Sequence, residues 1–88
     1  MRITVTRTGG FAGLTREATL DTAGRADAAG LEALARRALA EGAAAPPAGV
    51  PDGFAYRVTA DGRTAHFADP RLTGAQREIV RTVLKEGA

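Results

Sequence analysis

The chain contains few of the side chains that enzymes use for nucleophilic or metal-assisted chemistry. Serine, cysteine, asparagine and tryptophan are absent, and His66 is the one histidine. A Ser-His or Cys-His nucleophile pair is therefore impossible, and neither thiolate metal ligands nor a His-rich zinc site can form. A threonine nucleophile or an aspartate pair stays open, but neither has a supporting spacing, and the aspartates are scattered at predicted caps and turns. We expect no catalytic residue, no metal ligand and no cofactor.

The stretch RTGGFAG, residues 7–13, suggests binding instead. It surrounds one large apolar residue, Phe11, with three glycines in a chain that has only 5% aromatic residues. Glycines permit positive φ and a close approach of a partner. Phe11 can fold back as a lid on the core, or it can be displayed on the turn as an interface anchor. The residues alone leave both interpretations open.

Two kinds of periodicity alternate along the chain. Alternating apolar and polar residues predict strands, and apolar residues at i, i+3, i+4 and i+7 predict helices. The predicted strands cover Arg2–Thr8, Leu14–Leu20, 54–59 and Thr64–Asp69. The predicted helices cover Asp27–Glu41 and the segment that follows Thr73.

The order β-β-α-β-β-α predicts an α+β two-layer sandwich, formed as a single domain over residues 1–88. A helix of this length returns the chain to the end of the sheet that it left. If the third strand pairs beside the first, the sheet is fully antiparallel in the order 2-1-3-4, with both helices on one face. The Gly9–Gly13 turn and the Pro-rich loop Gly42–Gly53 should then lie at the same end.

Local signals refine this expectation. Asp27 is a predicted N-cap whose carboxylate accepts a first-turn amide, Gly42 is predicted to stop that helix, and Thr73 with Gln76 forms a capping box. The pair Asp61-Gly62 favours a tight hairpin turn. Leu14, Ala18 and Leu20 share the inward parity of their strand. The expected core comprises Ile3, Val5, Leu20, Leu31, Leu34, Tyr56, Val58, Phe67, Ile79 and Val83.

Charge and hydropathy narrow the choice of partner. A net charge of +2 is weak for a nucleic-acid binder, and no apolar run approaches the length of a membrane span. The first residues lack the apolar region and cleavage site of a signal peptide, so we expect a cytoplasmic protein. His66 is expected on the polar face of an outer strand, solvated rather than acting as a ligand. We expect a monomer that binds neither nucleic acid nor membrane.

The sequence VTRTGGFAGLTRE, residues 5–17, resembles the amino-terminal signature of the emfourin family. The resemblance continues through PDGFAYRVTADGR, residues 51–63, and the Leu/Val-rich final helix. Emfourins are small proteins that inhibit thermolysin-like zinc metallopeptidases and are typically encoded beside a protealysin-type protease gene. The resemblance implies an inhibitor of an M4-type metalloprotease, with the zinc in the partner.

This resemblance also suggests which residues touch the partner. Thermolysin-like proteases favour a large apolar side chain just after the scissile bond, so Phe11 is expected to enter that pocket or its rim. The remaining expected contacts are the turn residues Gly9, Gly10, Ala12 and Gly13, the flanking Arg7 and Arg16, and Pro46 and Pro47 of the Pro-rich loop. Two alternatives stay open: a small binding module for a different protein, and a weak nucleic-acid binder.

Overall fold

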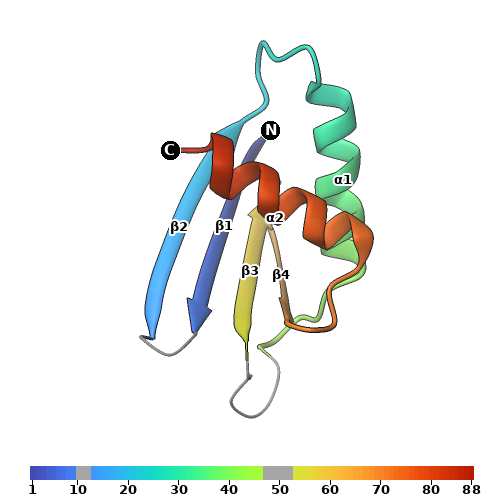
Figure 1. The fold of residues 1–88 in the computed structure, drawn as a ribbon. Coiled ribbons are helices and arrows are strands. Elements are labelled where there is room, and N and C mark those ends of the chain that lie inside the picture. The colour runs from blue at the N-terminus through green and yellow to red at the C-terminus, as the bar shows by residue number, and fades with distance from the viewer. Residues whose placement is uncertain (10–12, 47–52) are drawn as a thin grey trace.

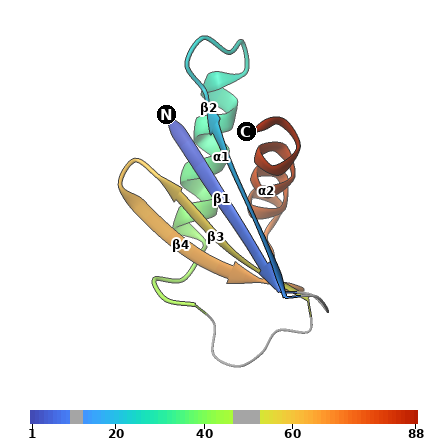
Figure 2. The same cartoon turned by 90° about the vertical axis from the view of Figure 1, so that its left-hand side faces the viewer.

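The computed structural model describes residues 1–9, 13–46 and 53–88, which form four strands and two helices (Figure 1). The sheet is antiparallel throughout, in the order β2-β1-β3-β4. Both helices lie on one face of the sheet, and Figure 2 shows the other face uncovered. The predicted α+β architecture is therefore confirmed. The elements are β1 (Arg2–Gly9), β2 (Leu14–Asp21), α1 (Ala28–Ala40), β3 (Phe54–Ala60), β4 (Arg63–Ala68) and α2 (Gly74–Glu86).

The core lies between the sheet and the two helices. Inward-facing Ile3, Val5 and Val58 of the central strands are fully buried, as are Ile79 and Val83 of α2. Eight of the ten predicted core residues are buried. The other two, Leu34 and Tyr56, are half-buried and pack against the edge of the cluster.

The helix starts differ in how well the sequence predicted them. Thr73 and Gln76 form the predicted capping box. The buried side-chain amide of Gln76 also donates a hydrogen bond to the Ala38 carbonyl of α1 at 3.3 Å. Asp27 occupies the predicted N-cap position of α1, but the predicted hydrogen bond from its carboxylate to a first-turn amide is absent. Arg25 holds that carboxylate through two hydrogen bonds of 2.8 and 3.0 Å, and this hydrogen bonding, with the charge of Arg25 second, lowers the pKa of Asp27.

The two ends of β2 have different surroundings. Ala18 and Leu20 are buried as their parity predicts, but Leu14 is 72% exposed, so its predicted inward role is wrong. In Figure 1, α2 crosses the sheet obliquely and leaves the turn-proximal ends of β1 and β2 uncovered. Leu14 therefore lies beyond the edge of the helical layer.

The chain leaves α1 by packing closely against β4. A Cβ atom on Gly42 would lie 2.8 Å from the Cβ atom of Ala65, so a larger residue has no room there. Gly42 therefore permits this close packing. The helix ends at Ala40 with Glu41 as its C-cap, so it stops just before Gly42 as predicted, although Gly42 lacks the positive φ of a left-handed cap. The next residue, Ala43, pairs with His66 through two backbone hydrogen bonds of 2.8 and 2.9 Å. This bridge directs the chain around the outer edge of β4 toward Pro46.

Candidate functional site

The described ends of the two predicted contact segments meet at Gly9. Gly9 lies opposite Leu14 in β2 and opposite Phe54 in β3. Its φ is +119°, and a Cβ atom there would lie 2.9 Å from the carbonyl oxygen of Gly53. Only glycine accepts both this φ and this contact. The expectation that the turn and the Pro-rich loop leave the sheet at one end is confirmed by these flanking residues.

A row of aromatic rings supports this end of the sheet. The guanidinium of Arg7 lies 4.4 Å from the centre of the Phe54 ring, a cation–π contact. The centres of the Phe54 and Tyr56 rings are 6.4 Å apart, and the Tyr56 ring stacks on Phe67 at 5.7 Å. These contacts hold Phe54 and Tyr56, at the start of β3, against the core.

Asp69 fastens the start of β3 to the end of β4. Its Oδ2 accepts a hydrogen bond from the Phe54 amide at 3.0 Å, and its own amide donates to the Phe54 carbonyl at 2.9 Å. A Cβ atom on Gly53 would lie 2.8 Å from the Cβ atom of Asp69, so this junction also requires glycine. Burial, and secondarily the negative charge of Asp69, raise the pKa of Tyr56, whereas Arg7 acts in the opposite direction. The Tyr56 phenol therefore stays neutral at neutral pH.

A hollow of about 600 Å³ opens beside this junction, on the helix-covered face of the sheet. Most of its lining residues come from β1, β2 and β3 and from α2, and Figure 1 shows how these elements are arranged. We call it the basic groove, because five cationic side chains line it: Arg7, Arg16, Arg77, Arg81 and Lys85. These are five of the chain's twelve Lys and Arg residues. Positive charge is therefore concentrated beside Gly9.

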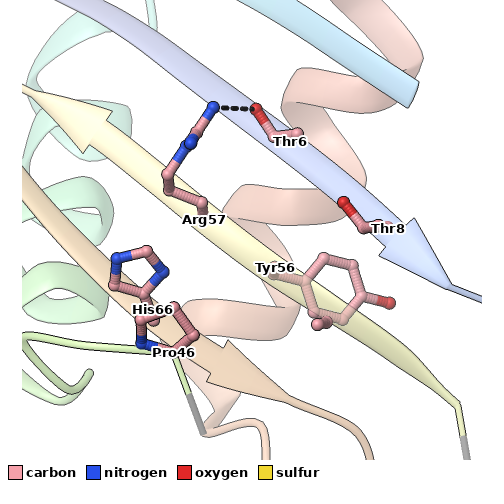
Figure 3. Close-up of a pocket in the computed structure, with 7 residues that line it drawn as sticks. Thr6, Thr8, Pro46, Tyr56, Arg57 and His66 are labelled. Carbon is pink, nitrogen blue, oxygen red and sulfur yellow. Dashed lines mark hydrogen bonds between the residues drawn. The ribbon is translucent and has the colours of Figure 1, made fainter. Parts of the chain in front are cut away.

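A smaller hollow of about 260 Å³ lies on the open face of the same sheet end. Figure 3 shows Pro46 beside His66, and Arg57 reaching Thr6 at 3.5 Å. His66 takes the position expected for it, half-buried on the polar face of β4. Within residues 1–9, 13–46 and 53–88, no group of three or more His, Cys, Asp or Glu side chains could hold a metal ion.

The structure brings together some of the expected contact residues and separates others. Arg7 and Arg16 are direct cross-strand partners on the helix-covered face. Pro46 lies on the opposite face, among the residues that line the smaller hollow. Gly13 has a φ of +61° with open space around its Cβ position. The remaining expected contacts lie outside the described residues: Gly10, Phe11, Ala12 and Pro47.

Sequence reasoning missed the contribution of α2 to this site. Arg77, Arg81 and Lys85 recur every four residues, so they share one exposed stripe of the helix. In the sequence this spacing is typical of a solvated helix face. Only the oblique course of α2 places the stripe opposite Arg7 and Arg16.

Comparison with known proteins gives one match. The family model described as Emfourin matches residues 5–84, which is nearly the whole chain. No curated protein and no solved structure matches the chain significantly. Of the helices in the part of the chain that the structure describes, none has the length and apolar character needed to cross a membrane.

Proposed function

Because the chain belongs to the emfourin family of metallopeptidase inhibitors, we propose that it inhibits a thermolysin-like zinc metallopeptidase of the M4 class. In this proposal the end of the sheet that carries Gly9 enters the substrate cleft of the peptidase. The inhibitor thereby blocks access of substrate and contributes no catalytic group of its own.

The observation that carries this proposal is the junction at Gly9. Gly9, where the first segment begins, packs directly against Gly53, where the second segment ends. The two backbones approach too closely there for Gly9 to carry any side chain. Asp69 fixes the neighbouring Phe54 through a pair of hydrogen bonds. A protein that occupies a cleft benefits from such a rigid base, because little conformational entropy is then lost on binding.

Phe11 is the proposed anchor in the cleft. It follows Gly9 by two residues, and its large apolar side chain suits the pocket that thermolysin-like enzymes use for the residue after the scissile bond. Arg7 contacts the face of Phe54, so its guanidinium supports β3 as well as adding positive charge near the turn. Pro46 is a second proposed contact, on the opposite face of the same sheet end.

The zinc ion in this proposal belongs to the peptidase and stays there. The inhibitor has no cysteine and a single histidine, so it has a poor ligand set with which to extract the metal. We propose that it acts as a monomer in the cytoplasm, together with a peptidase of the same cell.

The proposal is tested by titrating a thermolysin-like peptidase with the purified protein. A peptidase encoded beside the inhibitor's own gene is the first choice of target. We expect activity to fall linearly to zero near one inhibitor per enzyme, with the zinc content of the enzyme unchanged. Full activity at a large excess of inhibitor would instead favour a binding module for a different protein.

A further inference from the structure

The basic groove has a charge arrangement that works against the stability of the free protein. Arg7 and Arg16 lie directly opposite each other on adjacent strands, a pairing of like charges that destabilises a sheet. Arg77, Arg81 and Lys85 repeat the same problem at i, i+4 spacing along α2. The groove therefore gathers positive charge from three separate elements.

Nearby groups only partly compensate this charge. Arg81 forms an ion pair with Glu78 at 3.1 Å, and Arg16 donates a hydrogen bond to the Leu84 carbonyl. Among the described residues, neither Arg77 nor Lys85 has an acidic partner within ion-pair distance, and Asp69 is the one carboxylate that lines the groove. Asp69 is already engaged by the Phe54 amide. The groove thus has unused capacity for negative charge.

Apart from the five cationic residues and Asp69, the lining is largely apolar. The half-buried Leu72 and Tyr56 contribute to it, together with Val80 and Leu84 of α2, which are each only 6% exposed. A surface of this kind complements carboxylates that flank an apolar side chain. It complements a nucleic acid less well, because the one aromatic ring of its lining, that of Tyr56, is already stacked on Phe67.

We propose that the basic groove docks an acidic surface of the inhibited metallopeptidase, next to the cleft that the Gly9 end of the sheet enters. This inference rests on the proposed function and adds a second, electrostatic contact to it. The groove attracts the acidic surface at long range and so accelerates association. Once the two surfaces touch, the apolar lining excludes water from the ion pairs.

The test compares two double variants that carry the same net charge. The groove variant combines Arg77→Glu with Lys85→Glu. The control combines Arg37→Glu with Arg63→Glu, two exposed residues that do not line the groove. Each double variant changes the formal net charge of the protein from +2 to −2. Association with the peptidase is followed by surface plasmon resonance at several ionic strengths.

We expect the groove variant to associate at least about tenfold more slowly than wild type at low ionic strength, and to lose the salt dependence of the wild-type rate. The control should keep most of the wild-type rate. Equal rates for the two variants would contradict a local contact and overturn the inference. If the Glu variant fails to fold, the neutral pair Arg77→Gln and Lys85→Gln should still slow association, and an unchanged rate would again overturn it.

Two further outcomes separate this inference from its premise. If wild type inhibits and the groove variant inhibits and associates equally well, only the docking inference fails. If wild type inhibits no thermolysin-like peptidase, the proposed function fails and the inference fails with it. Binding of a short oligonucleotide to wild type at physiological salt, lost in the groove variant, would assign the groove to nucleic acid and overturn the docking inference.

Discussion

Replacing Gly9 by alanine should damage the junction on which the proposed binding surface is built. The backbone φ of +119° lies in a region that is essentially restricted to glycine, and strain of this kind costs roughly 1 to 3 kcal/mol. The added Cβ atom would also lie 2.9 Å from the Gly53 carbonyl oxygen, a backbone atom that cannot move aside alone. We therefore expect Gly9→Ala to cost about 2 to 3 kcal/mol of unfolding free energy, near the top of that range.

This cost should be visible as a fall in the thermal midpoint. In a domain of this size 1 kcal/mol shifts the midpoint by about 4 to 8 °C, so Gly9→Ala should lower it by roughly 10 to 20 °C. Gly30→Ala is the matched control, because Gly30 is an exposed residue of α1 with nothing within 4 Å of its Cβ position. That change should raise stability by up to about 1 kcal/mol, since alanine favours a helix more than glycine does.

Inhibition by the Gly9→Ala protein should be measured well below its thermal midpoint, so that only folded molecules are compared. A displaced junction should weaken inhibition at least about tenfold, which corresponds to about 1.4 kcal/mol. Two results would refute the reasoning. One is a Gly9→Ala midpoint equal to that of wild type, and the other is a strongly destabilised protein that inhibits with wild-type affinity once folded.

Three further predictions concern single side chains. Phe11→Ala should leave the thermal midpoint nearly unchanged and weaken binding by at least about 2 kcal/mol; a loss of roughly 3 to 5 kcal/mol of stability with unchanged inhibition would make Phe11 a core residue. Thr73→Ala should cost about 1 kcal/mol in a denaturant titration by removing the side-chain cap of α2, whereas Asp27→Ala should cost much less, because the Asp27 carboxylate makes no cap hydrogen bond. The tyrosinate absorbance of the single tyrosine, Tyr56, should titrate at higher pH in the folded protein than in denaturant. The contribution of this raised pKa to the free energy of unfolding should be lost as pH rises through the folded-state value. Titration at the same pH in both states would contradict the burial of the phenol.

The fold was predictable because its signals are local and mutually consistent. The alternation of residues in each strand, the Asp61-Gly62 turn and the Thr73-Gln76 capping box all depend on residues close in sequence. Loop length and helix length then leave few ways to connect the elements, and the strand order follows. The N-cap position of Asp27 was predicted correctly, but its cap hydrogen bond was not, because the nearby Arg25 binds the same carboxylate and cap preferences alone do not include that competition.

The candidate site was predictable only where it depends on the turn itself. The glycines on either side of residues 10–12 indicated a special backbone, and Gly9 and Gly13 both have positive φ. The basic groove was not predictable, because the stripe on α2 has the spacing of an ordinary solvated face. This stripe lines a groove only because α2 crosses the sheet obliquely, and the course of α2 results from packing over the whole core.

Competition with a small active-site ligand tests the central claim most directly. A thermolysin-like peptidase is saturated with a tight zinc-binding peptidomimetic that fills the cleft, and binding of the wild-type inhibitor is then measured by calorimetry. If the Gly9 end of the sheet occupies the cleft, the filled peptidase should bind no inhibitor, and the empty peptidase should bind one molecule. A ternary complex of peptidase, peptidomimetic and inhibitor, formed with undiminished affinity, would show that the inhibitor binds elsewhere and would contradict the account.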